Sequence, residues 1–199
     1  MMYDNIEDIT FSVLDIETTG LSVENGDKII EIGAVKIEPG LCLNTSNSFT
    51  SLINPEQPIP YSSYKIHNID DSMVADSPRA FEILPEFSGF LKDSVIIAHN
   101  AKFDISFINY YMNSFDIKWD CSTVIDTLKL SRKVFPYLKK YNLDHLIKYF
   151  NIFITLQYSH RHRALYDALN TALLFLKCID KIKFINNELS FDTLINLSI

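Results

Sequence analysis

Hydrophobic and polar positions near the N-terminus follow the pattern of buried strands. Three segments, at residues 11–16, 29–37 and 49–53, are rich in apolar and β-branched side chains. The second and third are joined through Pro39-Gly40, and short connections of this kind favour antiparallel neighbours. The first part of the chain is therefore predicted to fold as an antiparallel meander.

After residue 54 the pattern changes to helices that alternate with short strands. Pro55, Pro58 and Pro60 first predict an extended loop that runs to Ile69. The elements expected beyond it are a helix from about 77 to 91, a strand at 95–98, a helix to about 113, a strand at 119–125, and helices at about 126, 143–150 and 163–180. A strand that passes through a helix into a further strand implies a parallel pair. We therefore predict an α/β fold with a mixed central sheet flanked by helices.

Composition and charge fit one soluble domain. The 199 residues are 47% hydrophobic, which is ample for a core. With 18 basic and 25 acidic side chains the net charge is −7, which argues against tight, charge-driven nucleic-acid binding but leaves room for an enzyme whose acids hold metal ions. Three separated cysteines indicate neither a disulfide framework nor a zinc site. Without a leader or an apolar run of membrane length, we expect a cytoplasmic protein with a domain at 1–180 and a short tail at 181–199.

Two carboxylates close the first predicted strand. Asp15 and Glu17 are two residues apart, so both point to the same face. Paired acids beside a core are unfavourable unless a cation or a proton intervenes, and hard oxygen ligands suit Mg²⁺ or Mn²⁺. Thr18, Thr19 and Gly20 then end the strand, and the glycine would let the backbone approach a ligand. A solvated strand end is the alternative interpretation.

Two further acids occupy helix positions. Asp104 lies in a first helical turn, where the helix dipole alone favours an acid. Asp167 lies between Ala164 and Ala168, small residues that would let this turn press against the sheet. Alternatively, Asp167 forms a surface ion pair with Arg163, four residues earlier on the helix.

Two histidines precede the final helix. His160 and His162 are both candidates for a general base, because an imidazole takes up a proton near neutral pH. His162 is five residues before Asp167, about 140° around a helix, so it is expected in the preceding loop or the first turn. The two histidines could instead bind a transition metal, although no cysteine or further histidine lies close by in sequence.

Three motifs together resemble a known family. The segments DIETTG at 15–20, HNAKFD at 99–104 and HRALYDA at 162–168 are similar to the three exonuclease motifs of the DEDD superfamily, in its histidine-bearing (DEDDh) branch. This branch includes the epsilon subunit of bacterial DNA polymerase III and the exonuclease domain of PolC-type polymerases. Each motif is weak alone, but the three occur in order and at compatible spacing over residues 9–180. The resemblance implies a ribonuclease H-like fold.

The resemblance also implies a role for each motif residue. Asp15, Glu17, Asp104 and Asp167 would hold two divalent ions, Mg²⁺ or Mn²⁺, and the family spacing selects His162 as the base. A further set would contact or line the substrate pocket, with Leu21 wedged against the terminal base: Thr18, Thr19, Gly20, Leu21, His67, Asn100 and Phe103.

By this resemblance the protein would be a 3′–5′ exonuclease that releases nucleoside 5′-monophosphates from single-stranded or mispaired DNA ends. An exoribonuclease acting on short RNAs or RNA 3′ ends is the alternative, because discrimination of the sugar depends on pocket shape. A non-catalytic binding subunit is disfavoured by the presence of all four acids and the histidine. A replicative DNA polymerase would be a useful partner for an acidic chain, and no membrane association is expected. A free-standing nuclease is also expected, since an epsilon-type C-terminal extension is not evident.

Overall fold

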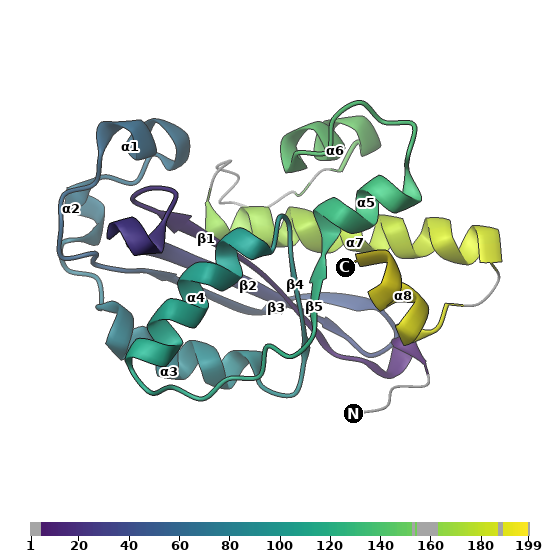
Figure 1. The fold of residues 1–199 in the computed structure, drawn as a ribbon, viewed down its shortest axis with the longest axis horizontal. Coiled ribbons are helices and arrows are strands. Elements are labelled where there is room, and N and C mark those ends of the chain that lie inside the picture. Colours follow the sequence, from purple (N-terminus) through teal and green to yellow (C-terminus); the bar gives the residue numbers. More distant parts are fainter. Residues whose placement is uncertain (1–4, 153, 155–162, 187–188, 199) are drawn as a thin grey trace.

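The centre of the molecule is a five-stranded sheet in the order β3-β2-β1-β4-β5 (Figure 1). The computed structural model describes residues 5–152, 154, 163–186 and 189–198. β2 is antiparallel to both β1 and β3, whereas β4 is parallel to both β1 and β5. The predicted mixed sheet is therefore confirmed. The strands are β1 (Phe11–Thr18), β2 (Ile29–Glu38), β3 (Cys42–Leu52), β4 (Val95–Ala98) and β5 (Val124–Asp126).

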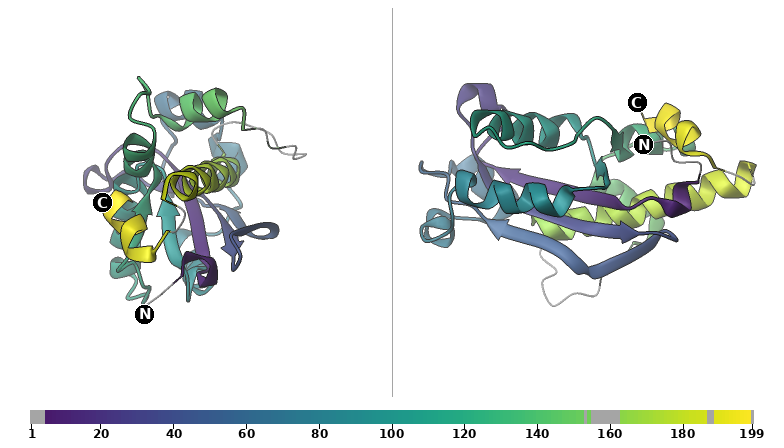
Figure 2. Two further views of the ribbon diagram at one scale, coloured as in Figure 1. Left: turned by 90° about the vertical axis from the view of Figure 1, so that its right-hand side faces the viewer. Right: turned by 90° about the horizontal axis from the view of Figure 1, so that it is seen from below.

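Helices cover both faces of this sheet (Figure 2). One face packs against α3 and α4, and the other packs against α7 together with α5, α6 and α8. None of the described helices has both the length and the apolar character needed to cross a membrane. The helices are η1 (Ile6–Asp8), η2 (Val23–Asn25), α1 (Tyr61–His67), α2 (Asp71–Val74), α3 (Ala80–Leu91), α4 (Lys102–Ser114), α5 (Thr127–Val134), α6 (Leu143–Phe150), α7 (Ala164–Asn186) and α8 (Phe191–Ser198).

Alternate residues of β1 supply the two layers of the core. Phe11 and Val13 are fully buried in the layer that contains α7, whereas Leu14 is buried in the layer that contains α4. Because neighbouring side chains of a strand point to opposite faces, Asp15 and Glu17 continue the row of Phe11 and Val13. The period of two therefore directs both carboxylates to the α7 face of the sheet.

The first turn of α7 lies closer to β2 than a side chain would allow. Gly33 of β2 pairs with Asp15 of β1. A Cβ atom on Gly33 would lie 2.1 Å from the backbone nitrogen of Leu165 and 2.3 Å from the carbonyl carbon of Ala164. A glycine is therefore required here, and it places the beginning of α7 directly over the strand pair that carries Asp15.

Several boundaries differ from the sequence-based prediction. The expected extended loop after Pro60 is wrong from Tyr61 onward, because α1 begins there, and Pro60 has the extended backbone of an N-cap (φ −60°, ψ 141°). Proline is compatible with a helix start, so the prolines did not exclude this helix. The strand expected at 119–125 begins only at Val124. Trp119 lies outside the sheet, because its indole N–H donates to Asn109 on α4 (3.1 Å). β3 begins earlier than expected, and α7 extends to Asn186.

Candidate active site

Three carboxylates meet where β1 ends. One oxygen from each of Asp15, Glu17 and Asp167 can be chosen so that all three atoms lie within 4.8 Å of one another. Asp15 and Glu17 are partly buried, and Asp167 is 8% exposed. Asp167 belongs to the first turn of α7, where its backbone N–H donates to the carbonyl of Arg163 (3.0 Å). The close approach of this turn at Gly33 is therefore what brings Asp167 to the strand.

A fourth carboxylate approaches from the α4 side. Asp104 is in the first turn of α4 and is 3% exposed. Its Oδ1 accepts a hydrogen bond from the backbone N–H of Ile16 (3.2 Å), the residue between Asp15 and Glu17. This bond fixes Asp104 beside the end of β1, and its charge is the largest electrostatic influence on Asp15 after burial itself. The structure thus brings together all four acids singled out in the sequence.

Burial and neighbouring negative charges make Asp15, Glu17 and Asp104 hard to ionise. Burial raises the pKa of Asp15 well above its ordinary value, and the charges of Asp104, Glu17 and Asp167 raise it further. Burial raises the pKa of Glu17 to about 8, again with help from Asp167. The pKa of Asp104 is also raised to about 8 by burial, against the lowering effect of its backbone hydrogen bonds. Such a cluster is stabilised by protons or by cations.

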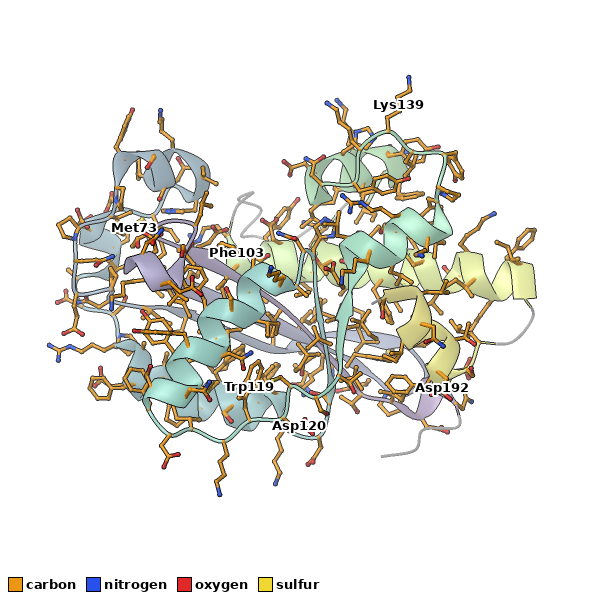
Figure 3. The ribbon with its side chains drawn as sticks, viewed as in Figure 1. Met73, Phe103, Trp119, Asp120, Lys139 and Asp192 are labelled. Atoms are coloured by element: carbon orange, nitrogen blue, oxygen red, sulfur yellow. The ribbon has the colours of Figure 1, made fainter. Side chains whose placement is uncertain are left out.

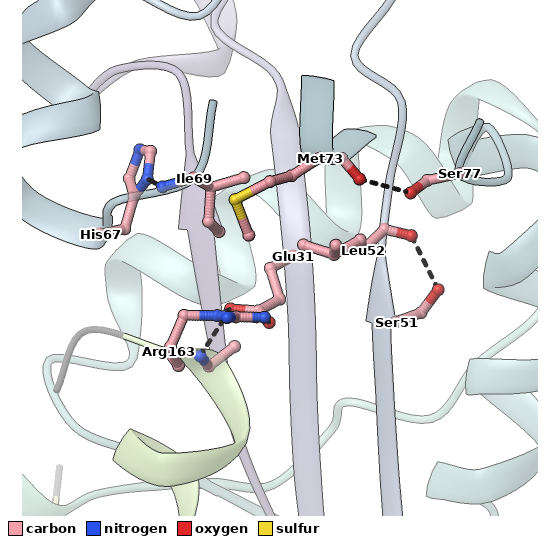
Figure 4. A network of polar contacts seen from close by, with 9 residues as sticks. Glu31, Ser51, Leu52, His67, Ile69, Met73, Ser77 and Arg163 are labelled. Atoms are coloured by element: carbon pink, nitrogen blue, oxygen red, sulfur yellow. Dashed lines mark hydrogen bonds and ion pairs between the residues drawn. The ribbon is translucent and has the colours of Figure 1, made fainter. Parts of the chain in front are cut away.

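An ion pair that the sequence analysis missed anchors α7 beside the acids. Arg163 donates from Nη2 to Oε1 of Glu31 (2.6 Å) and from Nε to both carboxylate oxygens (2.9 and 3.0 Å), as Figure 4 shows. The other oxygen of Glu31 accepts from the backbone N–H of Ala164 (2.9 Å), so Glu31 also caps the helix. Arg163 therefore pairs with Glu31, and the alternative pairing of Asp167 with Arg163 is not what the structure gives. The signal was an acid in the middle of the apolar strand 29–37, which required a buried partner.

The segment after β1 is held by internal hydrogen bonds. The Thr18 hydroxyl donates to the carbonyl of Gly20 (2.6 Å), and Thr19 Oγ1 accepts from the backbone N–H of Lys28 (2.8 Å). The space beside Gly20 is filled by the Asp27 carboxylate, which would be 2.3 Å from an added Cβ. Leu21, in contrast, is 84% exposed. The rim of the site is thus a rigid turn that presents one apolar side chain to solvent.

The remaining predicted pocket residues have structural contacts of their own. His67 of α1 is buried, and its Nδ1 accepts from the backbone N–H of Ile69 (3.0 Å). Phe103 lies at the N-terminal end of α4 (Figure 3), with its ring 5.2 Å from that of Phe107. Asn100 has a positive φ of 62°, and its N–H donates to Asp126 (3.1 Å). Substrate contacts by these three residues stay a prediction.

Histidines near the site fall into two groups. His99 is a hydrogen-bonding residue, because its ring nitrogens lie 2.9 Å from Thr127 Oγ1 and 2.9 Å from the carbonyl of Tyr141. Burial lowers its pKa. The candidate bases His160 and His162 lie outside the described residues.

A separate pocket lies at the opposite end of the sheet from the acids. Its volume is about 570 Å³, and it is lined by residues that include Val95 at the beginning of β4 together with Trp119 and Asp120. Figure 3 shows Trp119 and Asp120 far from α1 and α6, the helices on either side of the end of β1. This pocket is therefore not part of the carboxylate site.

The fold and the site together define a nuclease of the ribonuclease H-like class, which confirms the fold predicted from the three motifs. The particular family follows from comparison of sequences. The family model described as Exonuclease matches residues 12–175, and the chain belongs to this family. The predictions of an exonuclease of the epsilon and PolC type, and of a 3′–5′ exonuclease, are confirmed.

Two relatives and one solved structure define this similarity. The chain is 45% identical over 173 residues to the PolC-type DNA polymerase III of Caldanaerobacter subterraneus subsp. tengcongensis, covering 87% of this chain and 12% of that polymerase. It is 37% identical over 183 residues to the DNA polymerase III epsilon subunit of Aquifex aeolicus, covering 92% of this chain and 87% of that subunit. Its fold is similar to that of exonuclease X in complex with 5′ overhanging duplex DNA, with a TM-score of 0.71, 27% identity, and coverage of 94% and 99%.

Proposed function

We propose that this chain is a metal-dependent exonuclease that removes nucleoside 5′-monophosphates from the 3′ end of DNA, with single-stranded or mispaired ends as its preferred substrates. The observation that carries the proposal is the meeting of Asp15, Glu17 and Asp167 within 4.8 Å, beside Asp104. Support for DNA comes from relatives named as parts of DNA polymerase III and from a similar exonuclease solved with DNA. Proofreading in the cytoplasm, beside a replicative polymerase, is the role that fits these relatives.

The four carboxylates fit a site for divalent cations. Burial, and after it the neighbouring negative charges, raises the pKa values of Asp15, Glu17 and Asp104, and a cation bound by the carboxylate oxygens would offset both effects. The guanidinium of Arg163, at the beginning of α7, is engaged by Glu31. Carboxylate oxygens suit Mg²⁺ or Mn²⁺, which also keep positions for water and phosphate. Two such ions, when bound, would supply a hydroxide nucleophile and neutralise charge on the leaving 3′ oxygen.

The residues of the chain itself would do the positioning and the proton transfer. Asp15 and Glu17 are fixed by the sheet, while Asp104 is fixed by its bond to the backbone of β1. The exposed Leu21 would separate the terminal base from its neighbour. His162, assigned by its motif, would take a proton from the attacking water, which its ordinary pKa near 6.5 permits. We propose residues 1–180 as the nuclease domain and 181–199 as its tail.

The direct test is nucleotide release from 5′-labelled single strands of DNA and RNA, with Mg²⁺ or Mn²⁺ and then with EDTA. We expect progressive shortening of DNA from its 3′ end and none in EDTA. Asp167→Asn should lose more than about 100-fold in rate, because it removes one oxygen charge from the cluster. The matched control is Asp180→Asn, an exposed acid on the same helix, which should keep full activity. Release that survives EDTA would refute the metal mechanism, and release from RNA alone would favour the exoribonuclease.

The proposed base has its own test. His162→Ala should lose most of the activity, while His160→Ala should keep it, because only His162 has the motif spacing to Asp167. The pH dependence of kcat should also lose the ionisation of an imidazole base in His162→Ala. Equal effects of the two substitutions would overturn the assignment.

A further inference from the structure

A tyrosine pair stands exposed on α1, beside the carboxylate site. Tyr61 is 71% exposed, and its ring stacks on that of Tyr64 with centroids 6.0 Å apart and planes inclined by 22°. Lys65 Nζ lies 5.1 Å from the centroid of the Tyr61 ring. Aromatic side chains usually bury a large area, whereas Tyr61 leaves most of its ring in solvent. This arrangement is a ready surface for a flat, anion-bearing ligand.

The position of α1 is fixed relative to the end of β1. The Ser63 hydroxyl, from the turn that separates the two tyrosines, donates to the carbonyl of Thr19 (2.6 Å). Gln57, just before the helix, donates from Nε2 to Thr19 Oγ1 (3.1 Å). Thr19 is two residues beyond Glu17 and two before the exposed Leu21. Figure 1 shows α1 standing beside the end of β1, so the helix that carries the tyrosine pair borders the turn at the site.

The charge of this segment suits a phosphate backbone. Residues 57–69 contain no Asp or Glu, although the chain carries 25 acidic residues and a net charge of −7. Their charged or titratable side chains include Lys65, which is exposed, and His67, which is buried. A nucleic-acid strand that leaves the carboxylates over α1 can therefore meet the cation Lys65, while the nearby acid Asp71 accepts from the backbone N–H of Ile59 (2.9 Å).

We infer that Tyr61, backed by Tyr64 and flanked by Lys65, is a stacking subsite for a base of the DNA strand on the 5′ side of the terminal nucleotide. The inference rests on the proposed function as a DNA exonuclease. Bases of any kind stack on aromatic rings, so the subsite adds affinity without sequence preference. Lys65 can exchange its contact with the ring for one with a phosphate. The subsite thus holds the strand without touching the reacting phosphate.

Binding is measured first, by fluorescence anisotropy of 5′-fluorescein-(dT)₁₂ with Ca²⁺ or EDTA in place of Mg²⁺. Tyr61→Ser should raise Kd by roughly tenfold, as expected for loss of one stacked base. Tyr61→Phe keeps the ring and should stay within about twofold of the unsubstituted protein. Tyr110→Ser, which alters a 47% exposed tyrosine on α4, is the matched control and should also stay within about twofold. If Tyr61→Ser binds (dT)₁₂ as tightly as the unsubstituted protein, or if the unsubstituted protein does not bind it, the inference is overturned.

Kinetics then separate this subsite from the reaction itself. Tyr61→Ser should raise KM for (dT)₁₂ while kcat, and hydrolysis of the mononucleotide ester p-nitrophenyl thymidine 5′-phosphate, stay unchanged. An equal loss on both substrates would place Tyr61 in the catalytic machinery and refute the subsite. A protein that binds (dT)₁₂ through Tyr61 but hydrolyses neither substrate would refute the proposed function and leave the subsite standing.

Discussion

Gly33→Ala tests whether the position of α7 controls the site. Gly33 faces the first turn of α7, and its added Cβ would meet backbone atoms of Ala164 and Leu165 at 2.1–2.5 Å. Backbone atoms within a helix cannot rotate away as the end of a side chain can. The helix must therefore move, and Asp167, in the same turn, must move with it.

The size of this displacement follows from the contact distances. Ordinary contacts begin at 3.4 Å, so a Cβ at 2.1 Å from the Leu165 nitrogen requires a retreat of about 1.3 Å. Overpacking of this kind costs about 1–3 kcal/mol, which in a domain of this length lowers Tm by roughly 3–10 °C. A displacement of about 1 Å at a catalytic group can cost ~100-fold in rate. We therefore expect Gly33→Ala to lower kcat by ~100-fold while the protein still folds, with a lower Tm.

The assay compares Gly33→Ala with Gly89→Ala. Gly89 lies inside α3 with open space where a Cβ would be, so alanine there should stabilise the helix by about 0.5–1 kcal/mol and leave activity unchanged. Nucleotide release, Tm, and the rise in Tm on adding Mn²⁺ are measured for both variants. A Gly33→Ala protein with full activity and an unchanged Mn²⁺ effect would refute the reasoning.

Three further predictions follow from the site and its surroundings. Glu31→Gln should lower the free energy of unfolding by about 1–3 kcal/mol, which is less than for a fully buried ion pair because the Arg163 side chain is 31% exposed. Urea denaturation measures this free energy, and the control Glu86→Gln, on the exposed side of α3, should leave it unchanged. In EDTA, Tm should fall as pH rises from about 4 towards 8, because the pKa values of Glu17 and Asp104 are raised to about 8 in the folded state, so protonation of these acids favours folding below pH 8. The fall in Tm should be smaller in Glu17→Gln and after addition of Mn²⁺. A Tm that rises over this pH range would contradict the electrostatics. Asp126→Ala should lower the free energy of unfolding by about 1–2 kcal/mol in denaturant titrations, since the Asp126 carboxylate caps α5 by accepting from the Leu128 N–H (2.8 Å) and also accepts from the backbone N–H of Asn100. An unchanged denaturation midpoint would show that the cap is dispensable.

The sequence alone was sufficient to predict those structural elements that depend on the pattern of neighbouring residues. The period of two in β1 predicted that Asp15 and Glu17 share a face, and the small residues around Asp167 predicted that its turn lies against the sheet. The pattern from Val95 onward predicted the parallel part of the sheet. These signals need only near neighbours along the chain, which explains why they could be read without the structure.

Features that depend on distant partners could not be predicted in the same way. Glu31 and Arg163 are 132 residues apart, and a rule for neighbours on one helix could offer only Asp167 as an alternative partner for Arg163. An aromatic residue such as Trp119 fits a strand or a packed loop equally well by its hydrophobicity, and only its bond to Asn109 decides between them. The helix at Tyr61–His67 was hidden by prolines that end a loop as readily as they begin a helix.

The acidic cluster is assembled from distant parts of the sequence. Asp15 and Glu17 leave the ribosome before Asp167, which follows only after about 150 further residues have been translated. Since the cluster draws on β1, α4 and the beginning of α7, a growing chain has no complete carboxylate cluster until α7 has docked. If the cluster carries the proposed activity, the order of synthesis delays that activity until α7 has been made.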